Sequence, residues 1–320
     1  MRQGLDALAF RPRVLRDVSE IDCGGTVLGR KTRLPLSLAP MGSLPTMHPG
    51  GAMEVAKAAE EFGVVSYLSS VTQPGLEEIG SETGHPKVFQ LYVRGDRDWI
   101  ADHVRRAVDS GYAGFCLTVD VAVYSRRERD IIKRYVPTAR VRAQGMTHQA
   151  AMTWDLVKWF KDSFDIPLIL KGIAIAEDAA EAVDHGADVV YVSNHGGRQL
   201  DHGRATIEML PEIVAAVDGR AEVVVDGGFM RGSDVIKAIA LGASSVAIGK
   251  VQGFGLAADG RNGVSRVLEI LETEIRTNLG LLGVASFDTL DPSYLHPARP
   301  VMDSGVTSAF PLFQSPDWEY

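Results

Sequence analysis

Short apolar runs alternate with longer amphipathic stretches along the chain between residues 34 and 283. The apolar runs are rich in Val, Ile and Leu and are bounded by Gly, Pro, Asp or Ser, a pattern typical of buried strands. It predicts strands at residues 34–40, 64–70, 87–93, 114–120, 167–172, 188–194, 222–226 and 244–249. The stretches between and after them repeat apolar residues with the helical period. They predict helices at residues 51–62, 76–79, 98–109, 154–164, 177–185, 206–217, 233–241 and 264–279.

Eight strand–helix units in one uninterrupted series predict an α/β fold, a (β/α)₈ TIM barrel. The alternative is an open, doubly wound sheet. No Gly-x-Gly-x-x-Gly motif follows the first predicted strand, which counts against a dinucleotide-binding sheet of that kind. We therefore expect an N-terminal segment over residues 1–33, a barrel over 34–283 and a C-terminal tail over 284–320.

Composition narrows the class of protein. Of 320 residues, 45% are hydrophobic and 23% charged, as in a soluble globular protein, and the net charge is −8. This acidic balance, without any basic run, argues against nucleic-acid or membrane-surface binding. No apolar stretch is long enough to span a membrane, and the first residues lack a signal-peptide core. Two cysteines, Cys23 and Cys116, suggest neither a disulfide framework nor a metal site, and a reducing cytoplasm fits them. Cys116 lies in an apolar run and is interpreted as a core thiol.

The stretch Ser193-Asn194-His195-Gly196-Gly197-Arg198-Gln199-Leu200-Asp201 follows the strand predicted at 188–192. In a parallel α/β barrel, catalytic residues lie at this end of the strands. His195 can act as a base near neutral pH, and Arg198 offers a planar fork for a carboxylate. A plainer interpretation is a loop before a helix, with a solvated His and Arg.

This nine-residue string resembles a motif of the FMN-dependent α-hydroxy-acid oxidases and dehydrogenases. The segment Phe10-Arg11-Pro12-Arg13-Val14-Leu15-Arg16-Asp17-Val18 is also similar to that family, and the match covers roughly residues 10–283. The resemblance implies an FMN-binding barrel that oxidises a small 2-hydroxy acid to a 2-oxo acid. Dioxygen or another carrier would accept the electrons, and the chain would form a homo-oligomer, a tetramer in the family.

The resemblance also assigns catalytic roles. His195 would be the base, with Asp120 beside it. Arg198 would hold the substrate carboxylate, helped by Arg127 and Tyr92, although Arg127 alone could equally be a surface charge. Lys171 ends an apolar run, where an unpaired lysine would be costly, and it would stabilise the reduced flavin.

Further residues are candidates for the cofactor site. Glycines close the seventh and eighth predicted strands, the usual phosphate end of such barrels. Gln90 and Tyr92 share a strand face and need polar partners. The candidates are Ala39, Pro40, Met41, Gly42, Ser69, Gln90, Thr118, Lys171, His195, Arg198, Asp226, Gly227, Gly228, Arg231, Gly249 and Lys250, and no metal ligand is predicted.

The chain departs from the family at several positions. It begins after the segment that supplies a substrate-binding Tyr in the family, and Val71 stands where an aromatic residue is common. Met230 and Lys250 stand where the family has arginines, which predicts weaker phosphate binding, because a lysine is a point charge and not a fork. These differences leave a second hypothesis open, a related FMN oxidase for a larger, modified or non-carboxylate substrate. A third is a degenerate flavin barrel without catalysis, which the joint presence of Lys171, Asp120, His195 and Arg198 disfavours.

Two segments lack a clear period. Residues 135–152 fall where the family has a mobile loop over the active site. Residues 290–320 combine prolines, which prevent a long helix, with aromatic side chains that a solvated tail would seldom hold. We expect this tail to pack on its own barrel or on a neighbour.

Overall fold

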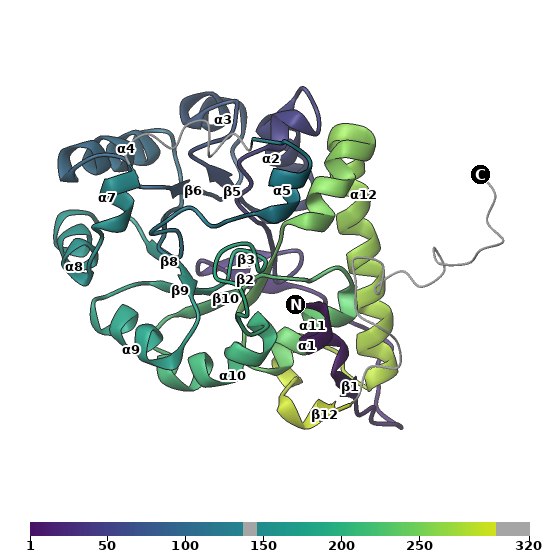
Figure 1. Ribbon diagram of the computed structural model, residues 1–320. Helices are drawn as coiled ribbons and strands as arrows, with labels where there is room; N and C mark the ends of the chain where they lie inside the picture. Colours follow the sequence, from purple (N-terminus) through teal and green to yellow (C-terminus); the bar gives the residue numbers. More distant parts are fainter. Residues whose placement is uncertain (137–145, 299–320) are drawn as a thin grey trace.

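The computed structural model describes residues 1–136 and 146–298 and shows a closed barrel of eight parallel strands surrounded by helices (Figure 1). The prediction of a (β/α)₈ barrel is confirmed, and the open-sheet alternative is wrong, because the first barrel strand pairs with the last. In barrel order the strands are β4 (Leu36–Leu38), β5 (Val65–Ser69), β6 (Lys87–Leu91), β7 (Gly114–Thr118), β8 (Leu168–Ile173), β9 (Val189–Val192), β10 (Glu222–Val225) and β11 (Ser245–Ile248). Each lies inside its predicted range except β8, which runs one residue further.

Amphipathic helices cover the outside of the barrel, and each buries its apolar side against the strands (Figure 1). They are α2 (Gly51–Phe62), α3 (Leu76–Glu82), α4 (Arg97–Asp109), α8 (Trp154–Ser163), α9 (Ala176–Asp184), α10 (Thr206–Val217), α11 (Gly232–Ala240) and α12 (Lys250–Leu282). Local chemistry sets several ends. Asp96 caps α4 by accepting a hydrogen bond from the Trp99 N–H, and Gly283, with φ of 73°, ends α12.

The last helix is longer than predicted. The sequence predicts a helix at 264–279, whereas α12 starts at Lys250 and is bent at Asp259 and Gly260, whose backbone angles are not helical. Glycines interrupt the helical repeat of apolar residues in the first half of α12, so the sequence pattern does not predict a helix there. One of them is required by packing, because a Cβ on Gly263 would lie 1.9 Å from the Gly255 carbonyl oxygen.

A hairpin of β2 (Gly25–Val27) and β3 (Arg30–Thr32) closes the amino-terminal end of the barrel. Val27 is fully buried and packs into the interior cluster with Tyr67, Cys116 and Tyr191. Cys116 is a buried free thiol, as predicted, and burial raises its pKa. The barrel interior is therefore a packed core below the carboxyl ends of the strands.

The two terminal segments pack together beside α10 and α11. Helix α1 (Arg2–Asp6) leads into β1 (Leu8–Phe10), which pairs antiparallel with β12 (Leu295–Pro297) (Figure 1). Two short 3₁₀ helices, Phe287–Thr289 and Pro292–Tyr294, precede β12, and a third, Leu44–Thr46, follows β4. Tyr294 and Leu295 are buried, so the described part of the tail packs on its own barrel as expected. Residues 299–320 lie outside the described part of the chain.

The predicted loop at 135–152 is partly helical. Helix α5 (Glu128–Ile132) precedes it and α7 (Met146–Ala150) lies within it. Gln149 of α7 is buried at the barrel rim, where its side chain accepts a hydrogen bond from the Val93 N–H and donates one to the Thr118 carbonyl oxygen. Residues 137–145 of this stretch lie outside the described residues, so the expected mobility of the loop stays a prediction.

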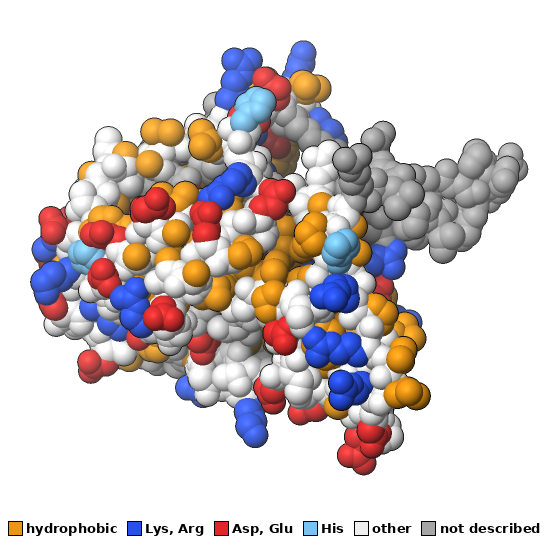
Figure 2. Space-filling view, turned by 90° about the horizontal axis from the view of Figure 1, so that it is seen from below, with side chains coloured by type: hydrophobic (Ala, Val, Ile, Leu, Met, Phe, Trp, Pro, Cys, Tyr) orange, Lys and Arg blue, Asp and Glu red, His pale blue; other side chains and the backbone are white. Residues whose placement is uncertain are grey.

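Charged side chains of both signs are interspersed on the face seen in Figure 2, where no continuous basic surface appears. Within residues 1–136 and 146–298, no helix combines the length and apolar character needed to cross a bilayer. The same residues contain no cluster of three His, Cys, Asp or Glu side chains arranged for a metal ion.

A buried histidine at the opposite end of the barrel from the candidate site predicts acid sensitivity. His85 is 7% exposed, its Nε2 lies 2.8 Å from the Ser66 Oγ, and its Nδ1 has no partner among the described residues. Burial, aided by the charge of Lys87, lowers its pKa from 6.5 to about 4. Between these values the unfolded chain takes up a proton that the native chain does not bind, so stability falls as the pH falls.

We expect the free energy of unfolding to drop by about 2–3 kcal/mol from His85 alone between pH 7 and pH 4. His85→Gln, which keeps a hydrogen-bonding group beside Ser66, should reduce that drop by a similar amount. Urea unfolding of both proteins at pH 7 and pH 4 measures the drop in the free energy of unfolding. An equal drop in both proteins would show that His85 does not cause it.

Candidate active site

His195 and Asp120 meet at the carboxyl end of the barrel. Asp120 follows β7 and His195 follows β9, and His195 Nδ1 lies 3.1 and 3.2 Å from the two carboxylate oxygens of Asp120. His195 has φ of 60°, a left-handed conformation that is strained for a residue with a side chain and is typical of functional sites. The contact sets Nδ1 as the protonated nitrogen, so Nε2 is the atom that can accept a proton.

The surroundings keep Asp120 ionised. Burial by itself would raise its pKa, but the hydrogen bond from His195 and the charge of Lys171 outweigh burial, and the pKa lies below its usual value. A carboxylate in this position stabilises the imidazolium that forms when Nε2 takes a proton.

Tyr92, which follows β6, completes this side of the site. Its hydroxyl lies 3.3 Å from His195 Nε2. Burial raises the pKa of Tyr92 to about 12, so the phenol stays protonated and can donate a hydrogen bond near neutral pH. The structure thus joins Asp120, His195 and Tyr92 in one line of polar groups.

Two arginines flank this line. Burial, followed by the charge of Arg198, lowers the pKa of Arg127. Arg127 stacks its guanidinium 4.6 Å from the Tyr124 ring centre and donates to the Gln199 side chain, while its Nε is buried without a partner among the described residues. Arg198 is about half exposed and lies 3.7 Å from Asp130. Two guanidinium groups that repel each other are suited to bind an anion such as a carboxylate between them.

Lys171, from β8, lies at the centre of the barrel top. Its Nζ is 3.1 Å from Asp226 Oδ2 and donates to Ser193 Oγ at 2.6 Å, and Ser193 donates to Asp226 Oδ1 at 2.7 Å. Burial disfavours the ammonium, but the charges of Asp226 and Asp120 outweigh burial and raise the Lys171 pKa. A permanent buried cation is therefore available to any ligand that gains negative charge above it.

Gln90 and Thr118 form a second polar pair on adjacent strands. Gln90 Nε2 donates to Thr118 Oγ1 at 2.8 Å, whereas Gln90 Oε1 is fully buried without a partner within the described residues. Ser69, at the end of β5, is also buried in this layer. An unpaired buried acceptor is costly and suits a ligand that presents an N–H group, such as the pyrimidine edge of a flavin.

The loops after β10 and β11 are adjacent, because these strands pair in parallel. Gly227 and Gly228 have φ of 107° and 85°, angles that residues with side chains rarely adopt. Among the described residues, no acceptor pairs with the N–H groups of Gly227, Gly228 or Gly249. Lys250 starts α12 directly after Gly249 and is exposed. Unpaired N–H groups together with a lysine form a cradle suited to a phosphate.

Other predicted residues lie around this cradle with different partners. Arg231 pairs with Glu274 on α12 at 3.3 Å, so its assignment to the cofactor stays a prediction. Ala39 is buried, and Pro40 and Met41 follow β4 at the barrel top. Gly42 packs against Val71, because a Cβ on Gly42 would lie 2.6 Å from Val71 Cγ2.

Three residues at the rim of the barrel are not predicted by the sequence analysis. Gln149 lies in the aperiodic stretch, and Tyr124 is recognised only by its stacking with Arg127. Gln252 is fully buried in the first turn of α12, and neither of its amide atoms has a partner among the described residues. A glutamine between apolar positions in the predicted strand-to-helix junction is the one signal that could have identified Gln252.

Comparison with known proteins gives one consistent result. Residues 1–297 match the family described as FMN-dependent dehydrogenase. The chain is 40% identical over 323 residues to the L-lactate oxidase of Nostoc sp., which covers 92% of this chain and 88% of that protein. It is 40% identical over 306 residues to the 4-hydroxymandelate oxidase of Amycolatopsis orientalis, with 89% and 85% covered.

Solved structures agree. A mandelate oxidase variant with (S)-mandelic acid has a TM-score of 0.86 and 40% identity, covering 94% of this chain and 89% of that one. A soluble variant of the membrane-associated (S)-mandelate dehydrogenase of Pseudomonas putida has a TM-score of 0.85 and 34% identity, covering 92% and 89%.

Proposed function

Because the chain belongs to the FMN-dependent dehydrogenase family and is an FMN-dependent enzyme that oxidises 2-hydroxy acids, we propose that His195 is its catalytic base. The observation that carries this proposal is the Asp120–His195 pair, in which Asp120 contacts Nδ1 and Nε2 is the ring nitrogen that can accept a proton. Nε2 accepts the proton that the substrate loses, while bound FMN supplies the acceptor for the two electrons. Asp120 holds the imidazole and stabilises its charged form.

Substrate binding follows from the charges around His195. Arg198 and Arg127 hold the carboxylate of the 2-hydroxy acid, and Tyr92 donates a hydrogen bond to the substrate oxygen next to Nε2. The substrates named for relatives, lactate, glycolate and mandelate, form the first panel to test. Val71 is smaller than the aromatic residue common at this position in the family, so the panel also includes the larger substrates of our second hypothesis.

The same geometry supports an assignment of residues to FMN. Lys171, held by Asp226, would stabilise the reduced flavin, and the polar layer of Gln90, Thr118 and Ser69 would hold its pyrimidine end. Asp226 positions Lys171, and the N–H groups of Gly227, Gly228 and Gly249 hold the phosphate together with Lys250. Ala39, Pro40, Met41 and Gly42 would lie against the flavin ring. Heat release and mass analysis of the bound cofactor test this, and absence of FMN after reconstitution would refute it.

We propose a homo-tetramer in the cytoplasm that passes its electrons to dioxygen or to another carrier. The oxidases among the relatives favour dioxygen, and the dehydrogenases favour another acceptor. Two buried free cysteines fit a reducing compartment. Oxygen consumption during turnover, and light scattering of the purified protein, test the acceptor and the subunit number.

Lys250→Ala should weaken FMN binding about tenfold, because it removes one charge-assisted contact to the phosphate. Lys250→Arg should bind FMN at least as tightly as the wild type, because its fork can make two contacts. Titration of the cofactor-free protein with FMN measures both, and riboflavin, which lacks the phosphate, is the control. An alanine variant with unchanged affinity for FMN would remove Lys250 from the site.

A further inference from the structure

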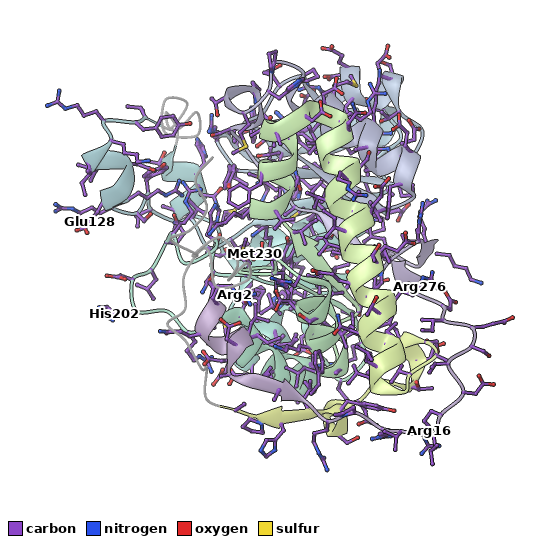
Figure 3. The ribbon with its side chains drawn as sticks, turned by 90° about the vertical axis from the view of Figure 1, so that its right-hand side faces the viewer. Arg2, Arg16, Glu128, His202, Met230 and Arg276 are labelled. Carbon is purple, nitrogen blue, oxygen red and sulfur yellow. The ribbon has the colours of Figure 1, made fainter. Side chains whose placement is uncertain are left out.

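Helix α1 packs directly on the loop that follows β10. A Cβ on Gly228 would lie 3.5 Å from Leu5 Cδ1, and Lys237 of α11 donates a hydrogen bond to the Leu5 carbonyl oxygen at 2.9 Å. Figure 3 shows Arg2 of α1 close to Met230 of this loop. The Arg2 guanidinium donates to the Gly228 carbonyl oxygen at 2.9 Å.

Arg2 also forms an ion pair with Asp234, in the first turn of α11. Arg2 NH1 lies 2.6 Å from Asp234 Oδ2, and NH2 lies 2.6 Å from Asp6 on its own helix. The Asp234 side chain is only 1% exposed. A carboxylate so deeply buried is costly without a cation, and within the described residues Arg2 is the cation paired with it.

Asp234 in turn shapes the loop. Its Oδ2 also accepts hydrogen bonds from the N–H groups of Met230 at 2.9 Å and Arg231 at 3.0 Å. These two residues follow Gly227 and Gly228, whose N–H groups have no acceptor among the described residues. The position of the cradle glycines therefore depends on a carboxylate that Arg2 holds in place through an ion pair.

We propose that Arg2 is a positioning residue for the phosphate cradle, which holds the 227–231 loop in its FMN-binding shape through Asp234 and the Gly228 carbonyl oxygen. The proposal rests on the function proposed above. The side chains nearest in sequence do not replace Arg2, because Met230 is apolar and buried and Arg231 pairs with Glu274. Arg2 would thus hold the 227–231 loop in position without itself contacting the phosphate.

The test compares Arg2→Ala and Arg2→Lys in the full chain, with Arg11→Ala as the matched control. Arg11 lies on the same terminal segment and donates to the Ser293 carbonyl oxygen, away from the loop. Two quantities are measured: the Kd of FMN and of riboflavin, and the hydrogen exchange of the Met230 and Arg231 amides in cofactor-free protein.

We expect Arg2→Ala to raise the Kd of FMN at least about tenfold, since it removes charge-assisted hydrogen bonds, while the Kd of riboflavin changes less than about twofold. Amide exchange at Met230 and Arg231 should accelerate. Arg2→Lys should raise the Kd of FMN less than Arg2→Ala does, because the ammonium keeps the positive charge. It should still raise the Kd, because an ammonium cannot contact Asp234, Gly228 and Asp6 together. Arg11→Ala should change neither quantity.

The inference would be overturned if Arg2→Ala left the Kd of FMN unchanged, or if it raised the Kd of FMN and of riboflavin equally. Neither result would contradict the proposed function. Should Arg2→Ala not fold, Arg2→Lys decides by the same comparison of FMN with riboflavin. A wild-type protein that binds FMN no more tightly than riboflavin would refute the assigned cradle, and this inference with it.

Discussion

Replacement of His195 by Gln should slow anaerobic reduction of the bound flavin by a 2-hydroxy acid at least about 10²-fold, and up to about 10⁴-fold. Gln can fill the space and contact Asp120, but it cannot take a proton at Nε2. Flavin should remain bound, because Lys171 and the cradle are unchanged. Rapid mixing of the holoenzyme with substrate, followed through the visible flavin band, measures the rate.

A histidine on the same loop provides the matched control. His202 is almost fully exposed and also has a positive φ, of 60°, but its side chain pairs only with the exposed Asp201 among the described residues. His202→Gln should therefore reduce its flavin at the wild-type rate. If His195→Gln behaved like His202→Gln, His195 would not be the base.

The second large effect concerns the stability of the barrel top. Lys171→Met should lower the free energy of unfolding of the cofactor-free protein by about 3–5 kcal/mol, because it leaves the Asp226 carboxylate buried without its cation. The Lys171→Met/Asp226→Asn double variant should recover most of that loss, since it removes both charges. Urea unfolding at neutral pH gives the values.

Lys250→Met is the control for this prediction, because Lys250 is exposed and should change stability by less than about 0.5 kcal/mol. A Lys171→Met variant as stable as the wild type, or a double variant as unstable as the single one, would show that Lys171 and Asp226 do not form a coupled pair.

Most of the fold can be read from local patterns. The strands are buried on both sides, so they appear as continuous apolar runs, and each helix shows its period because one side stays in water. Closure of the sheet between β4 and β11 follows from the number of units. The sequence pattern does not predict the first half of α12, because its glycines serve a close contact between Gly255 and Gly263, and such a contact leaves no periodic signal.

The candidate site could be predicted only in part. Asp120 and His195 are 75 positions apart, and only the family resemblance joins them before barrel closure is known. Arg231 is a candidate for the phosphate, and because its side chain pairs with Glu274 on α12 the structure does not test that assignment. Gln149 and Arg2 act through backbone groups of distant loops, which no residue pattern reveals.

Anaerobic mixing of the FMN-loaded wild-type protein with a panel of 2-hydroxy acids tests the central claim most directly. The account predicts that at least one acid bleaches the flavin band and yields its 2-oxo acid in equal amount to the flavin, and that the corresponding amide, which lacks the carboxylate charge, reacts far more slowly. A fully loaded flavin that no 2-hydroxy acid bleaches would contradict it.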